Sequence, residues 1–136
     1  MFQLHSKLAA DTLSVGKLQL CELRLLNDSR FPWAILVPMR TRITELHQLS
    51  AEEQTLLLDE SNAVARCLAG LPTVEKINIA ALGNIVPQFH WHVIGRSTAD
   101  PCWPSPVWGC GEAVAYEAKQ AEQLINLLRK DLQIAN

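Results

Sequence analysis

The sequence predicts an α+β fold, with an antiparallel sheet that is covered on one face by helices. Three observations support this class: polar and apolar residues alternate over residues 18–26, a capped amphipathic stretch begins at Ser50, and a second alternating segment covers residues 88–94. The chain has 136 residues, close to the roughly 150 residues of an average domain. We therefore expect a single domain, in which residues 96–136 form a C-terminal loop and helix.

Strands are expected where apolar residues alternate or run together. Residues 18–26 (LQLCELRLL) alternate with a change of phase near Leu20, and a β-bulge explains such a change. Residues 27–32 have the composition of a turn. Further strands are expected at residues 33–37, 75–82 and 88–94, where apolar runs or alternation recur.

The clearest helix begins at Ser50, which forms a capping box with Glu53. Apolar residues follow at helical spacing, and Gly70 ends the helix. A second helix is expected over residues 113–132, because apolar residues there recur on one side. Residues 96–111 contain three prolines and two tryptophans, so they are expected to form a loop.

Composition and charge exclude several classes of protein. Twelve basic and 14 acidic side chains give a net charge of −2, which argues against broad electrostatic binding to nucleic acid. The apolar stretches are far shorter than the roughly 20 residues of a membrane-spanning helix. The N-terminus also lacks the pattern of a secretory leader. We therefore expect a cytoplasmic protein that binds no membrane and no specific nucleic acid.

The four cysteines form no C-x-x-C pair. Cys21 and Cys67 lie in periodic apolar segments, so they are expected to be small core residues. Cys102 and Cys110 lie in the loop that is rich in tryptophan and proline. A disulfide and one half of a metal site are the alternatives to free thiols for this second pair.

One nine-residue segment, QFHWHVIGR, carries the candidate chemistry. Alternate side chains of a strand share a face, so Gln88, His90 and His92 are expected on one face, with Phe89 and Trp91 in the core. A solvated strand face is the ordinary interpretation of such a pattern. Half of the chain's four histidines occur here beside large aromatic residues, which favours a functional site.

Two chemistries suit a pair of imidazoles at alternate strand positions. A metal ion would take two ligands from the pair and a third from His47, Cys102 or Cys110, none of which is favoured by its spacing. Alternatively, one neutral imidazole attacks an electrophilic phosphorus and forms a covalent intermediate, while neighbouring groups orient the phosphate and move a proton. This second chemistry requires no metal and no cofactor.

The same segment resembles the signature of histidine triad (HIT) proteins, His-φ-His-φ-His-φ-φ with φ apolar, with Gln88 in the place of the first histidine. Residues 46–53 (LHQLSAEE) are similar to the start of the capped helix in that family. The resemblance covers about residues 18–96. It implies a HIT-like fold with about five antiparallel strands, a central capped helix and a C-terminal helix, assembled as a homodimer.

The resemblance also implies an activity and a set of site residues. A HIT protein of this type binds a purine nucleotide and cleaves a nucleoside-phosphate bond in a phosphoramidate, an adenylate or a dinucleoside polyphosphate. His90 matches the nucleophile that becomes nucleotidylated, His92 matches the histidine that contacts the phosphate, and Gln88 takes the first triad position. Nucleotide-binding positions are expected at Asn27, Asn78 and Asn84, and Phe31 is the candidate for contact with the base.

Three departures from the family pattern keep other functions open. Gln88 cannot carry a charge or transfer a proton. Ile85 stands where many members have a hydroxyl residue, and Pro32-Trp33 replaces the usual Gly-His pair. The alternatives are a nucleotide-binding protein with weak catalysis and, as a third possibility, a metal-dependent hydrolase with His90 and His92 as ligands.

Overall fold

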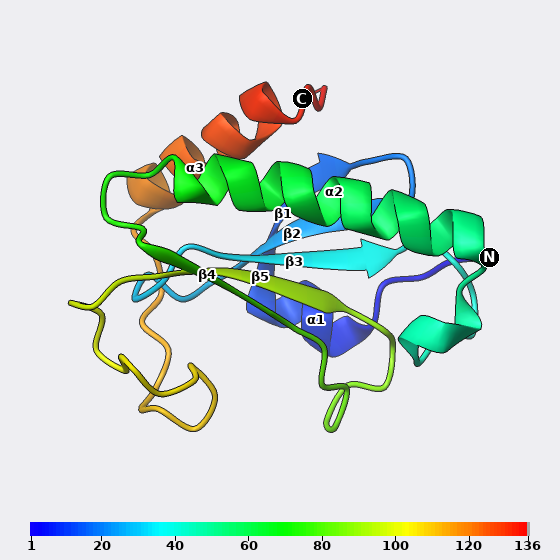
Figure 1. The fold of residues 1–136 in the computed structure, drawn as a ribbon, viewed down its shortest axis with the longest axis horizontal. Coiled ribbons are helices and arrows are strands. Elements are labelled where there is room, and N and C mark those ends of the chain that lie inside the picture. Colours follow the sequence, from blue (N-terminus) through cyan, green and yellow to red (C-terminus); the bar gives the residue numbers. More distant parts are fainter. Residues whose placement is uncertain (136) are drawn as a thin grey trace.

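A computed structural model, which describes residues 1–135, contains one antiparallel sheet of five strands in the order β1-β2-β3-β5-β4 (Figure 1). The strands are β1 (Thr12–Lys17), β2 (Cys21–Leu26), β3 (Trp33–Pro38), β4 (Lys76–Ala80) and β5 (Trp91–Arg96). The helices are α1 (Ser6–Asp11), α2 (Ala51–Ala69) and α3 (Ala118–Asp131), with a short 3-10 helix at Leu46–Gln48. The predicted α+β class and the five-stranded sheet are confirmed.

Strand β3 is buried along its whole length, because both faces of the sheet are covered there. Its Ala34 and Leu36 pack in the core beneath α2 and α3. Its Trp33 and Ile35 belong to a second core on the opposite face, together with Leu8 of α1. Figure 1 shows α2 along one side of the sheet and α1 on the other. The expectation of a single covered face was therefore wrong.

The capping box that the sequence predicts is present at the start of α2. The Ser50 hydroxyl accepts a hydrogen bond from the Glu53 backbone N–H at 3.1 Å, and the Glu53 carboxylate accepts one from the Ser50 N–H at 2.8 Å. Both bonds satisfy backbone donors that the first turn leaves free. Gly70 caps the other end, as expected. The helix packs three fully buried side chains onto the sheet, Leu57, Val64 and Leu68.

The N-terminal region differs from the prediction, since α1 and β1 were not expected. The predicted bulge near Leu20 is a turn between β1 and β2, and the irregular register lies in β1 between Ser14 and Gly16. The buried carboxylate of Glu60 on α2 holds this turn, because it accepts hydrogen bonds from the backbone N–H groups of Leu20 and Cys21 at 2.8 and 2.9 Å. The change of phase in the sequence therefore marks the start of β2.

The C-terminal helix begins later than predicted, at residue 118 instead of 113. The segment before it is extended and lies beside the turn between β2 and β3. The Tyr116 backbone N–H donates to the side-chain oxygen of Asn27 at 2.9 Å, and Ser29 N–H donates to the Val114 carbonyl at 2.6 Å. These bonds satisfy backbone groups that would otherwise start a helix.

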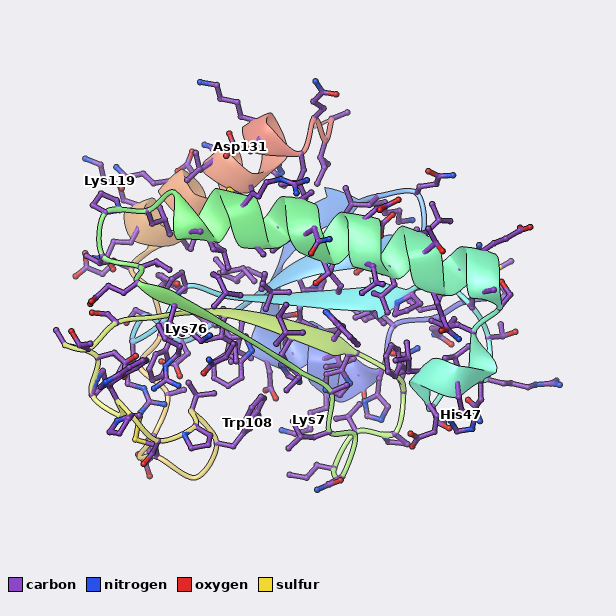
Figure 2. All side chains as sticks on the ribbon, in the orientation of Figure 1. Lys7, His47, Lys76, Trp108, Lys119 and Asp131 are labelled. Atoms are coloured by element: carbon purple, nitrogen blue, oxygen red, sulfur yellow. A yellow bond between two sulfur atoms is a disulfide. The ribbon has the colours of Figure 1, made fainter. Side chains whose placement is uncertain are left out.

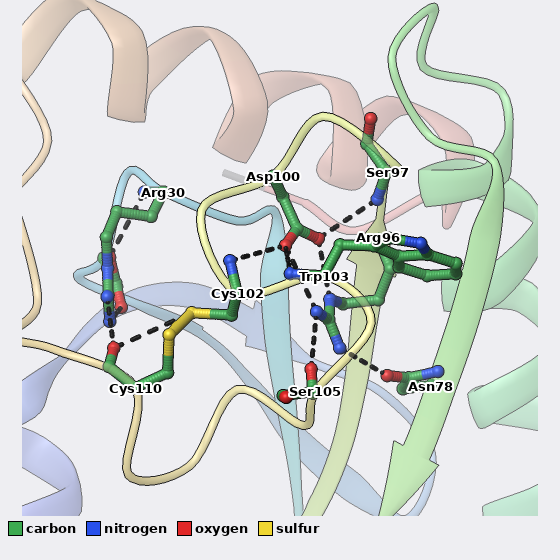
Figure 3. The surroundings of a disulfide bond; sticks show 10 residues. Arg30, Asn78, Arg96, Ser97, Asp100, Cys102, Trp103, Ser105 and Cys110 are labelled. Carbon is green, nitrogen blue, oxygen red and sulfur yellow. Dashed lines mark hydrogen bonds and ion pairs between the residues drawn. A yellow bond between two sulfur atoms is a disulfide. The ribbon is translucent and has the colours of Figure 1, made fainter.

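The loop between β5 and α3 is fixed by a disulfide and a buried ion pair (Figure 3). Cys102 and Cys110 form the disulfide, while Cys21 and Cys67 are free and buried, as expected for core residues. Arg96 pairs with Asp100 at 2.8 Å, and its other nitrogens donate to the Asn78 side chain and the Ser105 carbonyl, both at 2.8 Å. Within residues 1–135, no helix has the length and apolarity that crossing a membrane requires.

Candidate active site

His90 and His92 line one cavity of about 480 Å³ on the side of the sheet opposite α2. This volume falls within the roughly 300–1,000 Å³ that is usual for small-molecule sites. The two imidazole rings lie 4.9 Å apart between centroids. Much of the wall is apolar and comes from α1, β2, β3 and the loops on either side of β5. The apolar lining residues include Leu8, Leu26, Ile35, Leu82, Val86 and Trp108.

The backbone fixes the orientation of the His90 ring. His90 precedes the first residue of β5, and its Nδ1 lies 2.7 Å from the carbonyl oxygen of Gln88. A carbonyl oxygen only accepts hydrogen bonds, so Nδ1 carries the proton that it shares with Gln88. The neutral ring therefore has its lone pair on Nε2. An imidazole held in this tautomer presents a nucleophilic nitrogen to the cavity.

The indole of Trp33 fixes the His92 ring in the other neutral tautomer. Trp33 Nε1 donates a hydrogen bond to His92 Nδ1 at 2.9 Å. In the register of β3 and β5, His92 lies opposite Ile35 and Ile94 lies opposite Trp33, so Trp33 and His92 are diagonal neighbours on one sheet face. Because Nδ1 accepts this bond, the proton of a neutral His92 is on Nε2.

Burial makes the two histidines electrostatically unequal. His92 is 5% exposed, and burial lowers its pKa to about 3, with a further contribution from the neighbouring His90. A buried imidazole is harder to protonate because the cation loses its hydration. His92 is therefore neutral at physiological pH, and within the cavity it acts as a hydrogen-bond donor through Nε2.

Trp108 closes the cavity over His92 from the C-terminal loop. Its ring lies edge-on to the His92 ring at 5.1 Å and edge-on to the Trp33 ring at 5.6 Å. Edge-to-face contacts at this distance are favourable for aromatic rings. Trp108 is 36% exposed, so part of its surface remains open to a ligand. Figure 2 shows Trp108 and Lys7 on the same side of the molecule, and both residues line the cavity.

Gln88 does not share the cavity with the two histidines. Its side-chain oxygen accepts a hydrogen bond from the His5 backbone N–H at 2.8 Å, and its amide nitrogen donates to the Gln3 carbonyl at 2.9 Å. The side chain borders a separate hollow beside the first three residues of the chain. The expected common face of Gln88, His90 and His92 was wrong, because β5 begins only at Trp91.

The four predicted nucleotide-binding positions lie in different places, and one of them, Asn84, lines the cavity, at its exposed rim. The Asn27 side chain accepts the Tyr116 N–H, and the Asn78 side chain accepts from Arg96. Phe31 is 1% exposed, and the guanidinium groups of Arg30 and Arg96 both lie over its ring. Phe31 therefore has almost no exposed surface with which to contact a base in this arrangement.

Several cavity residues were not predicted from the sequence. The sequence pattern singles out Trp33 only as a departure from the family pattern, and it places Trp108 only in a loop. Lys7 and Asp11 belong to α1, and their side chains form an ion pair at 2.9 Å at the cavity. The contact between Trp33 and His92 follows from the pairing of β3 with β5, which a sequence pattern does not give. The hydrogen bonds of the Gln88 side chain to the backbone of Gln3 and His5, just before α1, likewise join residues far apart in the sequence.

The geometry offers little support for a metal centre. No group of three or more His, Cys, Asp or Glu side chains within residues 1–135 is arranged to hold an ion. Cys102 and Cys110 are joined in the disulfide. His47 is exposed and lies away from Lys7 and Trp108, as Figure 2 shows. The three residues considered as a third ligand are therefore not available to the histidine pair in this arrangement.

The fold and the cavity define a small α+β protein with two oriented imidazoles on one sheet face. The HIT domain pattern matches residues 7–99. The chain belongs to the histidine triad (HIT) family. No curated protein matches the chain significantly.

Solved structures agree with this assignment. A histidine triad protein from Marinobacter aquaeolei VT8 is 46% identical, with a TM-score of 0.94 and coverage of 99% of both chains. A histidine triad protein from Bradyrhizobium japonicum is 40% identical, with a TM-score of 0.94, and the match covers 96% of this chain and 98% of the other. A zinc-bound histidine triad family protein from Mycobacterium smegmatis is 17% identical, with a TM-score of 0.64 and coverage of 94% of this chain and 90% of the other, and this likeness shows the fold alone.

Proposed function

We propose that the protein binds a purine nucleoside phosphate and hydrolyses or transfers its nucleoside monophosphate group through a covalent intermediate on His90. The family is generally one of nucleotide-binding hydrolases and transferases, and this chain belongs to it. The observation that carries the proposal is the 2.7 Å contact between His90 Nδ1 and the Gln88 carbonyl. This contact leaves Nε2 as a free nucleophile at the wall of a cavity of suitable size.

The proposed reaction has two displacements at phosphorus. In the first, the lone pair of His90 Nε2 attacks phosphorus, and the bond to the leaving group breaks with its electron pair on the leaving group. A carboxylate departs as the anion, whereas an amine takes a proton from water. In the second, water attacks the same phosphorus, the N–P bond breaks, and its electron pair returns to Nε2 while a proton passes to solvent. His92 donates from Nε2 to a phosphoryl oxygen, because charge on that oxygen increases in each transition state.

The cavity favours a substrate that places one phosphoryl group beside the histidines. Lys7 and Asp11 are its charged lining residues, and they pair with each other. A single ammonium that is already paired neutralises little of the negative charge on a chain of phosphates. An adenylate or a related nucleoside monophosphate derivative therefore fits better than a dinucleoside polyphosphate. The base lies against the apolar wall near Trp108, and Asn84 at the rim donates to the phosphate or the ribose.

The protein is further proposed to belong to a branch of the family with glutamine in the first triad position. The function assigned to Gln88 is positioning: its carbonyl orients His90, and its side chain holds the N-terminal segment that leads into α1. The homodimer is proposed from the family resemblance, and the cytoplasmic location is proposed from the sequence pattern of the N-terminus and the cysteines. Sedimentation velocity and cell fractionation test them. Disulfides are rare in the reducing cytosol, so fractionation should include the thiol state of Cys102 and Cys110.

The covalent intermediate is tested by intact-mass measurement after brief mixing with an adenosine phosphoramidate and, in parallel, with a mixed anhydride of adenosine monophosphate and a carboxylic acid. We expect an acid-labile adduct of one nucleoside monophosphate in the native protein and in the His47→Ala variant, and none in His90→Ala. His47 is the matched control because it is exposed and outside the cavity.

Two other outcomes would overturn this function. Tight binding of adenosine monophosphate, with neither adduct nor turnover, would show a nucleotide-binding protein without catalysis. Turnover that is lost with a chelator and restored by zinc would show a metal-dependent hydrolase with His90 and His92 as ligands.

A further inference from the structure

The contact between Trp33 and His92 has a chemical consequence for the proposed reaction. Both side chains are buried, each 5% exposed, and the indole nitrogen lies 2.9 Å from Nδ1 of the imidazole. An indole nitrogen only donates hydrogen bonds. Nδ1 must therefore be unprotonated while this bond exists, and protonation there would place two N–H groups against each other. His92 can become a cation only if the bond to Trp33 breaks.

The groups that face His92 do not favour a cation. His90 is its nearest titratable neighbour, and a positive charge on either ring disfavours one on the other. Helix α1 contributes Lys7 and Asp11 to the cavity, but this carboxylate is exposed and already paired with the ammonium. The other segments that line the cavity, from β1, β2, β3, residues 82–86 and residues 108–109, contribute no titratable side chain.

We propose that Trp33 is a positioning residue that holds His92 as a neutral Nε2–H hydrogen-bond donor, so that the site has one nucleophilic imidazole and one fixed donor in place of two proton carriers. The proposal rests on the proposed function. His92 then keeps its proton when His90 attacks phosphorus, and a leaving group that needs a proton must take it from water.

This arrangement selects a substrate class by its leaving group. A carboxylate departs from a mixed anhydride as a stable anion and needs no proton while the bond to phosphorus breaks. An alkylamine departs from a phosphoramidate only if its nitrogen is protonated, and neither imidazole of the site supplies that proton. Acyl adenylates are therefore the preferred class, and phosphoramidates of alkylamines are poor substrates.

The tautomer is tested without any substrate by ¹⁵N NMR of the histidine side chains between pH 8 and pH 5. In the native protein we expect the proton of His92 on Nε2 throughout this range and no conversion to the cation. Trp33→Phe keeps an aromatic ring but removes the donor, so His92 should begin to convert to the cation within this range. Trp108→Phe is the matched control, because Trp108 contacts the same imidazole only through its ring, and its His92 should show no conversion to the cation in this range.

The leaving-group preference is the second measurement. We expect the native protein to prefer the acyl adenylate over the alkyl phosphoramidate. Trp33→Phe should lower kcat on the acyl adenylate roughly tenfold, because the hydrogen bond from His92 Nε2 to the charged phosphoryl oxygen is weakened. The ratio of kcat on the acyl adenylate to kcat on the alkyl phosphoramidate should fall in Trp33→Phe and not in Trp108→Phe. A native His92 that carries its proton on Nδ1, or becomes cationic above pH 5, would overturn the inference even if Trp33→Phe fails to fold. If the His92 tautomer is as proposed but no adduct forms with either substrate, the proposed function is overturned and the tautomer assignment is not.

Discussion

The side-chain amide of Gln88 contacts the N-terminal segment of the chain, where its oxygen accepts a hydrogen bond from the His5 backbone N–H at 2.8 Å. The substitution of glutamine for the first histidine of the family pattern therefore affects the support of α1 more directly than the chemistry. The backbone carbonyl of the same residue orients His90, and any residue at position 88 supplies that carbonyl.

This relationship predicts the effect of Gln88→Ala. We expect kcat to change by less than about threefold, because the catalytic contact comes from the backbone, while the free energy of unfolding falls by about 1–2 kcal/mol through the loss of two hydrogen bonds. Gln88→His should not increase kcat. Steady-state kinetics and urea unfolding test both variants, with His90→Ala as the inactive control. A hundredfold loss of kcat in a folded Gln88→Ala variant would show that the amide takes part in the reaction.

The sequence identified the elements whose signals are local. The capping box of Ser50 and Glu53, the buried strand at 33–37 and the H-x-H pair all depend on residues close together in the chain, and each is present. The missed features depend on distant partners. Glu60 holds the turn before β2 from 40 residues away, and the Trp33 contact crosses 59 residues. Sequence alternation placed Gln88 on the strand, but its side chain is bound by backbone groups of residues 3 and 5.

The lowered pKa of His92 predicts a loss of stability in mild acid. The unfolded chain binds a proton at this residue below about pH 6.5, whereas the folded protein does not until about pH 3. Stability from this residue is therefore complete above pH 6.5 and is lost as the pH falls toward 3. Between pH 7 and pH 5 this linkage amounts to about 2 kcal/mol.

The measurement is denaturant unfolding of the native protein and of His92→Gln at both pH values. Glutamine does not titrate, and its side-chain oxygen can still accept the indole hydrogen bond of Trp33. Between pH 7 and pH 5, the free energy of unfolding should fall by about 2 kcal/mol more in the native protein than in the variant. Equal losses would mean that His92 is protonated in the folded protein over this range.

The Cys102–Cys110 disulfide predicts a defined thiol count and a defined effect on the cavity. Protein produced under oxidising conditions and unfolded without reductant should expose two of its four cysteines to a thiol reagent, and all four after reduction. Cys102→Ser/Cys110→Ser should lower the free energy of unfolding by about 2 kcal/mol. Nucleotide affinity should fall as well, because Trp108 lies between the two cysteines and covers His92. Four reactive thiols before reduction would exclude the disulfide in the native protein.

The ion pair of Arg96 and Asp100 predicts the largest loss of stability from a single substitution outside the cavity. The two side chains are 1% and 6% exposed. Burial by itself would raise the pKa of Asp100, but hydrogen bonds from Arg96 and from the backbone N–H groups of Ser97, Cys102 and Trp103 lower it to about 2. Arg96→Met leaves this carboxylate buried without its counter-charge, which costs about 3–5 kcal/mol in such sites.

The double variant Arg96→Met/Asp100→Asn separates loss of charge pairing from loss of packing. Asparagine carries no charge, so the double variant should be more stable than Arg96→Met by at least about 1 kcal/mol. Lys119→Met, an exposed position on α3, is the control and should change stability by less than about 0.5 kcal/mol. Urea unfolding gives all three values. Arg96 joins residues 78, 100 and 105, so its guanidinium group is expected to hold the loop that carries Trp108 (Figure 3). If Arg96→Met lowers the free energy of unfolding no more than the Lys119 control does, the disulfide holds this loop and the guanidinium group does not.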